Sequence, residues 1–215
     1  MIKISPSLLA ADFANLEREI KGVYNGGADM LHLDVMDGKF VTNISFGLPV
    51  IESIRKITDM VFDVHLMIDA PERYIERFIS AGADIVTFHL EATEVADECI
   101  RIIKRAGKKV GISIKPMTPA EAVYPYLEEC DMILVMTVEP GYGGQSIIPE
   151  CLEKVRKIKA EIESRNLDVD IQVDGGINIG TARDAVLSGA NVLVAGSAVF
   201  GKSDVGAVIK ALKEE

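Results

Sequence analysis

The sequence predicts an α/β fold, a single (β/α)8 TIM barrel, and three observations support this. The chain has 215 residues, 48% of them hydrophobic, which is enough to bury a large core in one domain. Eight short β-branched runs alternate with stretches of helical periodicity, which is typical of a parallel sheet. Gly-Ala-Asp at 27–29 and 82–84 and Gly-Ala-Asn at 189–191 recur where a predicted helix ends and a strand begins. No linker interrupts the pattern, so we expect residues 1–215 to form a single domain.

Each strand is expected where apolar, β-branched residues cluster between turn residues. Amphipathic helices are expected between the strands, for example over residues 14–24, 71–80 and 149–165. An open, doubly wound sheet is the alternative, but eight regular units favour closure into a barrel whose active face lies at the carboxyl ends of the strands. The predicted strands are residues 2–8, 29–35, 60–66, 84–90, 109–114, 131–137, 169–174 and 191–196.

Composition argues against several classes of protein. A formal net charge of -10 and a pI near 4.9, without a dense run of Lys or Arg, argue against a nucleic-acid or membrane partner. No apolar stretch approaches the roughly 18 residues of a membrane span, and residues 1–6 lack the apolar run of a signal peptide. We therefore expect a soluble, cytoplasmic protein. Cys99, Cys130 and Cys151 form no close pair, so we expect structural thiols without a disulfide framework.

The second predicted strand carries two polar residues on one face. His32 and Asp34 are two residues apart in an apolar run, and a strand directs alternate side chains to the same side. Leu31, Leu33 and Val35 occupy the other face. A neutral imidazole beside a carboxylate is half of a divalent metal site. Considered alone, the pair is equally consistent with a hydrogen-bonded polar pair in a core.

The distribution of histidines favours the metal site. The chain has only three, His32, His65 and His89, and all lie near the carboxyl ends of consecutive predicted strands. Asp174 ends the seventh strand. Because these ends meet at one mouth of a barrel, His32, Asp34, His65 and Asp174 are predicted to converge as ligands of one Zn²⁺, Fe²⁺, Co²⁺ or Mn²⁺ ion.

Two further groups of residues are expected around this metal. His89 and Glu91 repeat the two-residue spacing and are predicted to lie behind the ligands, with direct ligation and barrel filling as alternatives. Met36, Met67 and Met136 are predicted to line the pocket above the metal as a polarizable, dry wall. Ordinary core packing is the alternative for the methionines.

Three glycine-rich turns follow the last three predicted strands, at residues 139–145, 174–178 and 195–198. Glycines allow the backbone to approach an anion closely, and backbone N–H groups bind a phosphate without cationic side chains. The turns after strands seven and eight are the usual phosphate position of a barrel, although tight connections alone also explain them. The longer turn at 139–145 is expected to act as a lid as well.

Five motifs spread over the chain point to a known enzyme family. They are Ser-Pro-Ser-Leu-Leu-Ala at 5–10, His-Leu-Asp-Val-Met-Asp-Gly-Lys-Phe-Val-x-Asn at 32–43, His-Leu-Met at 65–67, Met-Thr-Val-Glu-Pro-Gly-Tyr-Gly-Gly-Gln at 136–145 and Val-Asp-Gly-Gly at 173–176. Together they resemble the ribulose-phosphate 3-epimerase family over nearly the whole chain. Thr42 and Ile147 depart from the pattern, where the family usually has proline and an aromatic residue, but neither is a predicted ligand.

The resemblance implies an isomerase of the pentose phosphate pathway that interconverts D-ribulose 5-phosphate and D-xylulose 5-phosphate. It also implies one divalent metal ion per subunit, with Asp34 and Asp174 as the catalytic acid and base, and we expect a homo-oligomer. The substrate contacts that it implies are Ser7, His65, Gly141, Tyr142, Gly143, Gly144, Gly175, Gly176, Gly196 and Ser197.

The layout of the residues suits inversion at C3 of a 2-ketose. The proton α to the carbonyl must leave from one face and return on the other, so two acid/base groups have to flank the carbon. Asp34 and Asp174 come from strands far apart around the barrel, and a metal stabilises the enediolate. Allulose-6-phosphate 3-epimerase shares most of the motifs and is the first alternative. A metal-dependent barrel hydrolase and a non-catalytic barrel that binds sugar phosphates are the others.

Overall fold

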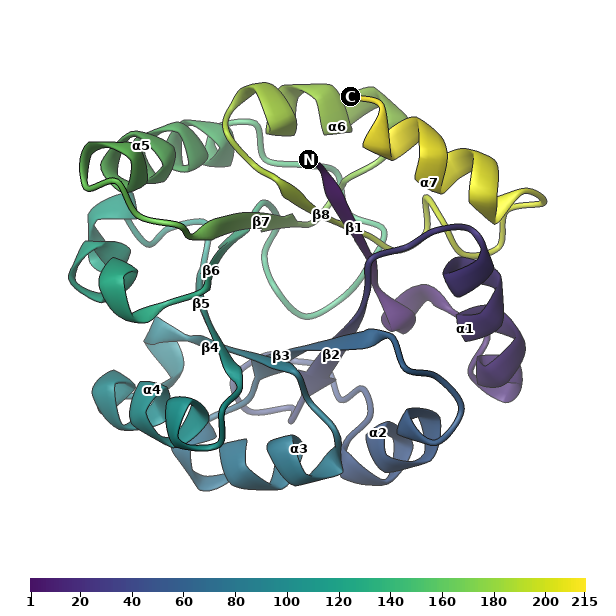
Figure 1. The fold of residues 1–215 in the computed structure, drawn as a ribbon, viewed down its shortest axis with the longest axis horizontal. Coiled ribbons are helices and arrows are strands. Elements are labelled where there is room, and N and C mark those ends of the chain that lie inside the picture. The colour runs from purple at the N-terminus through teal and green to yellow at the C-terminus, as the bar shows by residue number, and fades with distance from the viewer.

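The computed structural model describes residues 1–215, and eight parallel strands form a barrel surrounded by helices (Figure 1). Every strand begins and ends within two residues of its predicted bounds. The strands are β1 (Lys3–Pro6), β2 (Met30–Met36), β3 (Val61–Met67), β4 (Ile85–His89), β5 (Lys109–Ile114), β6 (Met132–Met136), β7 (Asp170–Asp174) and β8 (Val192–Ala195).

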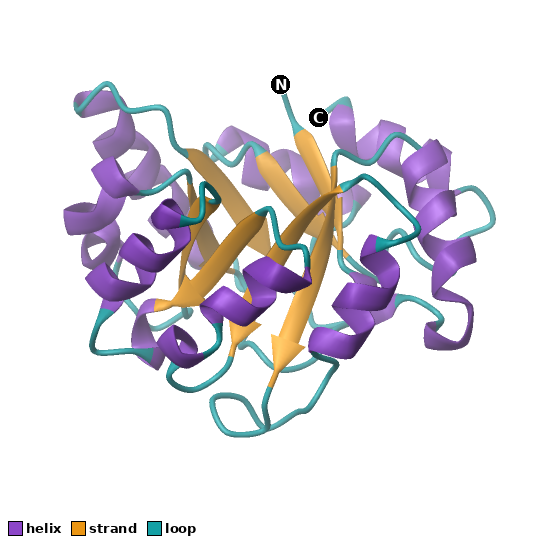
Figure 2. Cartoon of the chain, turned by 60° about the horizontal axis from the view of Figure 1, so that its bottom comes forward, coloured by secondary structure: helices purple, strands orange, loops and turns teal.

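Helices follow all but one of the strands and cover the outside of the barrel (Figure 2). The exception follows β5, where Ala120–Glu129 forms a 3₁₀ segment. Pro125 lies inside that segment and has no N–H to donate, so an α-helix cannot continue through it. The α-helices are α1 (Leu16–Asn25), α2 (Leu48–Arg55), α3 (Ile75–Ala81), α4 (Ala96–Arg105), α5 (Cys151–Ser164), α6 (Ile179–Leu187) and α7 (Val205–Lys213).

The sheet closes almost completely between its first and second strands. Seven neighbouring pairs share regular parallel ladders in the order β1-β8-β7-β6-β5-β4-β3-β2. Between β1 and β2, a single parallel bridge joins Ser7 and His32, and the N–H of Asp29 donates to the carbonyl of Ile4 at 3.0 Å. The predicted barrel is therefore confirmed, and the open sheet is excluded.

A recurrent side-chain contact explains the repeated Gly-Ala-Asp and Gly-Ala-Asn sequences. The residue immediately before each even-numbered strand accepts a hydrogen bond from a backbone N–H at the start of the preceding odd-numbered strand. Each pair is also joined by the reverse bond, from the N–H of the acceptor residue to the carbonyl of the donor residue. Four pairs of neighbouring strands are thereby aligned at their amino ends. Acceptor and donor are Asp29 and Ile4, Asp84 and Phe62, Asp131 and Val110, and Asn191 and Ile171, at 2.7–3.0 Å.

Burial differs between the two faces of the strands. The outward residues, such as Leu31 and Phe62, belong to the large apolar core between the barrel and its helices. Inside the barrel, a small apolar cluster from the even-numbered strands fills the amino end: Met30, Ile85, Met132 and Val192. Toward the carboxyl ends of the strands, the barrel interior contains buried polar side chains, and the candidate site is formed there.

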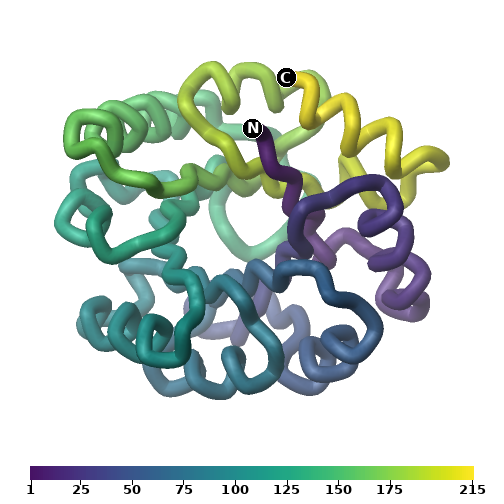
Figure 3. Tube along the Cα trace, in the orientation of Figure 1, coloured from purple at the N-terminus to yellow at the C-terminus, as the bar shows by residue number.

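The two termini lie close together at the amino end of the barrel, away from the carboxyl ends of the strands (Figures 2 and 3). Lys213, the last residue of α7, reinforces this arrangement because its Nζ lies 2.8 Å from Asp29 Oδ2. The connection between β6 and α5 extends across the barrel axis at the other end (Figure 1). None of the helices has the length and apolar content that crossing a lipid bilayer requires.

Candidate active site

Three strands bring together the four residues selected as metal ligands. His32 and Asp34 come from β2, His65 from β3 and Asp174 from the end of β7. Asp34 and His65 are direct neighbours in the sheet register. One donor atom from each of the four residues lies within 4.8 Å of all the others. Alternation along β2 thus places its two polar side chains inside the barrel, where β3 and β7 complete the cluster.

The spacing of the donor atoms fits a single divalent ion. Asp34 Oδ1 lies 3.2 Å from His32 Nε2 and 3.1 Å from His65 Nδ1. The two ring nitrogens are 3.3 Å apart, and Asp174 Oδ2 lies 3.9 Å from each of them. Ligands at 2.0–2.1 Å from a tetrahedral Zn²⁺ are about 3.3–3.4 Å from one another. Two imidazoles and two carboxylates at this spacing are a suitable set for Zn²⁺, Fe²⁺, Co²⁺ or Mn²⁺.

The two carboxyl groups of the cluster have opposite pKa shifts. Burial, together with the charge of Asp34, raises the pKa of Asp174 to about 7. Burial also acts to raise the pKa of Asp34, but the charge of His32 and hydrogen bonds from His32 and His65 outweigh it, and the pKa lies well below its usual range. Without a metal ion, one carboxyl is therefore ionised while its neighbour is about half protonated at pH 7. This pairing suits an acid and a base acting on one substrate.

The far nitrogen of His32 is held by a buried carboxylate. His32 Nδ1 lies 2.7 Å from Asp63 Oδ2, which also accepts from Ser5 Oγ at 3.1 Å and from Gln172 Nε2 at 2.6 Å. All four side chains are fully buried. Burial acts to lower the pKa of His32, but the charges of Asp34 and Asp63 outweigh it and raise the pKa well above its usual value, so without an ion the ring donates to both carboxylates. An ion that displaced the Nε2 proton would bind a ring that Asp63 holds at Nδ1. The sequence analysis did not select Asp63, although it alternates with His65 on β3 and so had to point into the barrel.

The far nitrogen of His65 meets a second histidine. His65 Nε2 lies 2.9 Å from His89 Nε2, and His89 Nδ1 lies 3.3 Å from Glu91 Oε2. Burial lowers the pKa of His89 to about 4. Burial acts to raise the pKa of Glu91, but hydrogen bonds from His89, from the Thr118 hydroxyl and from the Lys115 N–H outweigh it and lower the pKa to about 2. A neutral imidazole thus lies between His65, a candidate ligand, and a carboxylate.

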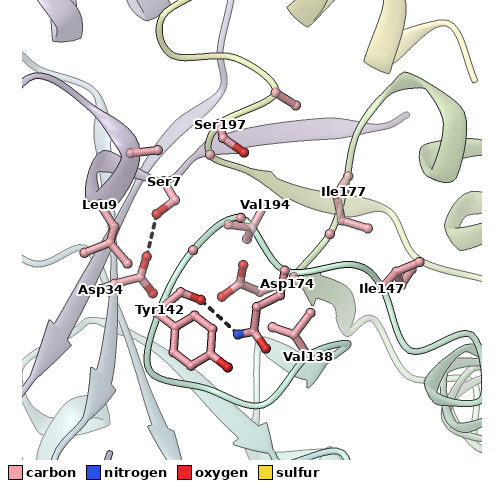
Figure 4. Close-up of a pocket in the computed structure, with 18 of the residues that line it drawn as sticks. Ser7, Leu9, Asp34, Val138, Tyr142, Ile147, Asp174, Ile177, Val194 and Ser197 are labelled. Atoms are coloured by element: carbon pink, nitrogen blue, oxygen red, sulfur yellow. Dashed lines mark hydrogen bonds between the residues drawn. The ribbon is translucent and has the colours of Figure 1, made fainter. Parts of the chain in front are cut away.

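A cavity of about 770 Å³ lies at the carboxyl ends of the strands and is lined by both aspartates of the cluster (Figure 4). Ser7 also lines it, and its Oγ donates to Asp34 Oδ2 at 2.5 Å. His32 and His65 are fully buried and are not part of the lining, so His65, which was also expected to contact substrate, reaches the site only through the cluster. The other selected residues that line the cavity are Met36, Met67, Met136, Gly141, Tyr142, Gly143, Gly144, Gly175, Gly176, Gly196 and Ser197.

The turn after β6 is folded on itself beside the cavity. Gln145 Nε2 donates to the backbone carbonyls of Glu139 and Tyr142 at 2.7 and 2.9 Å, and Figure 4 shows the second of these bonds. Asn43 Nδ2, from the connection between β2 and α2, donates to the carbonyl of Gly141 at 2.8 Å. The turn is therefore anchored at two points while the Tyr142 side chain stays largely exposed.

Two glycines of the turn after β7 are required by close packing as well as by backbone geometry. Gly175 and Gly176 have φ angles of 118° and 71°, in the region that favours glycine. A Cβ on Gly175 would lie 2.4 Å from Val138 Cγ2, and one on Gly176 would lie 2.3 Å from the backbone nitrogen of Ile147. The turns after β6 and β7 therefore pack against each other along one wall of the cavity.

Several lining residues were not selected from the sequence. Asn178 and Thr181 form a reciprocal capping box at the start of α6, a pattern that Asn-x-x-Thr after two glycines could have suggested. Lys202, in the connection between β8 and α7, is the only cationic residue of the lining. No motif surrounds Lys202, so the sequence offered no signal for it.

The three cysteines lie outside the site. Cys99, Cys130 and Cys151 are buried free thiols, and none of them lines the cavity. Burial raises the pKa of Cys99 and of Cys130 to about 12, which keeps these thiols protonated and unreactive.

Comparison with known proteins assigns the chain to a family. The model of the "Ribulose-phosphate 3 epimerase family" matches residues 3–200. The chain belongs to the ribulose-phosphate 3-epimerase family. Membership confirms the resemblance seen in the motifs and the predicted enzyme class, an epimerase. The chain is 48% identical over 205 residues to a ribulose-phosphate 3-epimerase of Bacillus subtilis, covering 95% of this chain and 94% of that protein.

Other members of the family are similar over the same length. The ribulose-phosphate 3-epimerase of Mycobacterium bovis is 49% identical over 212 residues, covering 99% of this chain and 92% of that protein. A rice protein named as the cytoplasmic isoform of the enzyme is 46% identical over 216 residues, covering 99% and 93%. Among solved structures, 3-hexulose-6-phosphate synthase from Salmonella typhimurium superposes with a TM-score of 0.73 at 24% identity, covering 99% of this chain and 97% of that chain. At that identity the likeness shows the shared fold alone.

Proposed function

We propose that the chain interconverts D-ribulose 5-phosphate and D-xylulose 5-phosphate by proton transfer at C3, as a single catalytic domain over residues 1–215. The observation that carries the proposal is the pair Asp34 and Asp174, which reach the floor of one cavity from β2 and β7. A reaction that removes a proton from one face of a carbon and returns one to the other face requires such a pair. Family membership supports the choice of substrate.

His32, Asp34, His65 and Asp174 are proposed to hold one divalent ion, since their donor atoms cluster within 4.8 Å. When bound, the ion acts as a Lewis acid that stabilises negative charge on the substrate oxygens as the proton leaves. His32 and His65 contribute no proton to the reaction in this proposal, because both are fully buried beneath the cavity.

Asp34 and Asp174 are proposed to exchange roles with the direction of the reaction. One carboxylate removes the C3 proton to form the enediolate, and the other, protonated, returns a proton to the opposite face. Their protonation is coupled through their shared position, so the pair is treated as one acid/base unit. The hydroxyl of Ser7 donates to Asp34 and helps to hold that carboxylate against the cavity. Met36, Met67 and Met136 exclude water from this region without offering a competing proton.

The phosphate is proposed to bind at the turns after β7 and β8. Gly175, Gly176, Gly196 and Ser197 line that part of the cavity, and their N–H groups supply donors without requiring a positive side chain. The turn from Gly141 to Gly144 is proposed to cover the sugar. Remote binding of the phosphate would hold C3 between the two aspartates.

Two further features are proposed for the protein as a whole. A homo-oligomer is expected, and light scattering on the purified protein gives its mass directly. A cytoplasmic location is supported by the name of the rice relative. Fractionation of cells that express the chain tests this second proposal.

The decisive experiment is incubation of the chain with ribulose 5-phosphate in heavy water. An epimerase incorporates deuterium from the solvent at C3 and forms xylulose 5-phosphate, which NMR detects. Release of inorganic phosphate would contradict the proposal and favour the hydrolase. Faster turnover of allulose 6-phosphate than of ribulose 5-phosphate would reassign the substrate to the six-carbon sugar.

A further inference from the structure

The two ligand histidines use different ring nitrogens, and each has its far nitrogen occupied. His32 presents Nε2 to the cluster while Nδ1 meets Asp63, and His65 presents Nδ1 while Nε2 meets His89. A neutral imidazole binds a metal only through the nitrogen that lacks a proton. For His32 the neighbouring carboxylate selects that nitrogen directly. For His65 the neighbour at Nε2 is another imidazole, which can either donate or accept. In the metal-free protein Asp34 Oδ1, 3.1 Å from Nδ1, favours a proton on that nitrogen, so a group beyond His89 has to favour Nε2 if Nδ1 is to be free for an ion.

We propose that Glu91 opposes Asp34 in this choice and acts, with His89, as a positioning residue for His65. A carboxylate can only accept, so Glu91 Oε2 requires a proton on His89 Nδ1, 3.3 Å away. Neutral His89 then has a bare Nε2, which accepts from His65 Nε2–H at 2.9 Å. A proton held on His65 Nε2 leaves Nδ1 bare for an ion that Asp34 and Asp174 also bind. The inference rests on the proposed metal site and adds the residue that keeps one of its ligands competent.

Glu91 is itself fixed by contacts that leave one oxygen free for His89. Its Oε1 accepts from the backbone N–H of Lys115 at 2.8 Å and from the hydroxyl of Thr118. The N–H of Lys115 is a donor that no side-chain rotation can remove. Oε1 is therefore committed, and Oε2 is the atom that faces the imidazole.

With Glu91 in place, the His89 ring is closed off from solvent. His89 is fully buried, and the ring of Phe40 lies over it with centroids 4.8 Å apart. The two rings are tilted by 47°, and the ammonium group of Lys115 lies 3.9 Å from the centroid of Phe40. The His89 ring consequently has only two polar neighbours at its nitrogens, Glu91 and His65.

Glu91→Gln tests the proposal because it changes one acceptor into a donor. The amide oxygen has to face the Lys115 N–H, so the amide nitrogen faces His89 Nδ1. His89 must then carry its proton on Nε2, and His65 must move its proton to Nδ1, the nitrogen that faces the cluster. In the metal-free proteins, where Asp34 favours a proton on Nδ1, ¹⁵N NMR of labelled histidine should show a larger share of the His65 proton on Nε2 in the wild type than in Glu91→Gln, in which the proton should lie on Nδ1. The chain has only three histidines, so the signals can be assigned.

The second measurement is the affinity for Zn²⁺ alone, by competition with a chromogenic chelator. We expect Glu91→Gln to weaken it by about 10- to 100-fold. Thr118→Val is the matched control, because it removes a donor to the same carboxylate but leaves Oε2 facing His89. The control should retain the wild-type tautomer and affinity. If Glu91→Gln fails to fold, Glu91→Ala should give His65 a mixture of tautomers and an intermediate loss of Zn²⁺ affinity.

An unchanged His65 tautomer in the folded glutamate variant would overturn the proposal. A reversed tautomer with unchanged Zn²⁺ affinity would instead overturn the assignment of His65 as a ligand, and with it the metal-binding consequence drawn here. Neither measurement depends on turnover of ribulose 5-phosphate. Failure of the proposed reaction is therefore distinguishable from failure of this relay.

Discussion

At the scale of single residues, the site is organised by a difference between two chemically identical side chains. Asp34 receives hydrogen bonds from His32, His65 and Ser7, which stabilise its charge. Asp174 Oδ2 lies 3.9 Å from His32 Nε2 and from His65 Nδ1, which is too far for a hydrogen bond. The nearby negative charge of Asp34 disfavours ionisation of Asp174. The environment alone therefore separates their pKa values, and the predictions at this scale concern that separation.

Replacement of Asp174 by asparagine should reduce kcat for ribulose 5-phosphate by about 10²- to 10⁴-fold, because the amide keeps the shape but cannot carry the proton. Steady-state kinetics and circular dichroism measure the loss and the retained fold. Asp170→Asn is the matched control on the same strand, since Asp170 lies at the amino end of β7 and pairs with Lys3. The control should keep its rate. Equal activity of the two variants would contradict the role of Asp174.

The raised pKa of Asp174 makes the stability of the metal-free protein depend on pH. The carboxyl has a pKa of about 7 in the folded state and near 3.8 in the unfolded chain, so between these values the folded state binds the extra proton. The free energy of unfolding contributed by this group is therefore highest below about pH 4 and is lost as pH rises to about 7. Urea unfolding with a chelator, compared between wild type and Asp174→Asn, isolates the effect. A difference between the two that stays constant with pH would refute it.

At the scale of elements, the barrel is built from four pairs of strands joined by the same contact. Asp29, Asp84, Asp131 and Asn191 each precede an even-numbered strand and bind the N–H of its odd-numbered neighbour. These contacts lie at the amino ends of the strands, while the site lies at the carboxyl ends. Register at one end therefore sets the heights of the polar side chains at the other, such as Asp34 beside His65.

Asp131→Ala should lower the free energy of unfolding by about 1–3 kcal/mol, because it leaves the N–H of Val110 without its acceptor in a partly buried position. Asp131→Asn retains an oxygen acceptor and should recover most of the loss. Chemical denaturation of both variants measures the two values. Indistinguishable stability of the alanine and asparagine variants would show that the side-chain acceptor is unimportant.

The turn after β8 offers a test of the phosphate site. A Cβ at Gly196 would lie 3.2 Å from Ala10 Cβ and 3.7 Å from Ser7 Cβ, so Gly196→Val fills the space between two walls of the cavity. We expect kcat/KM for ribulose 5-phosphate to fall much more than kcat/KM for dephosphorylated ribulose, with unchanged metal content. An equal loss on both substrates would move the phosphate elsewhere, first to the turn at Gly141 to Gly144.

At the scale of the whole molecule, the four residues proposed as metal ligands come from strands on opposite sides of the barrel. β2 and β3 are separated from β7 by three strands in one direction and by β1 and β8 in the other, and only the interior side chains join them directly. An ion bound there would link the two halves of the barrel. Metal binding should therefore stabilise the fold as well as the transition state.

Removal of the metal should lower the melting temperature of the protein. Zn²⁺ at about 100 times its dissociation constant contributes roughly 2.7 kcal/mol, which for a domain of this size is a shift of about 5–10 °C. Scanning calorimetry with and without a chelator measures it. His65→Ala removes one ligand and should abolish the shift, whereas a metal-dependent shift of full size in this variant would exclude His65 from the site.

The sequence by itself determined the fold class, the order of the elements and the four residues of the His/Asp cluster that is proposed to bind the metal. Alternation puts His32 and Asp34 on one face of a strand, and barrel geometry brings that face together with His65 and Asp174. These conclusions depend on periodicity and on topology, which are local or general properties. They need no knowledge of side-chain contacts between distant elements.

Only the tertiary structure decided which contacts give those residues their chemistry. Asp63 stabilises His32 and Glu91 reaches His65 through His89, and both links depend on the register of neighbouring strands. The opposite pKa shifts of the two aspartates depend on which of them the histidines approach. Lys202 reaches the cavity from a connection that carries no motif. Each of these features depends on contacts between residues that are distant in the chain. The pattern of residue types along the sequence does not specify the distances between such residues in space.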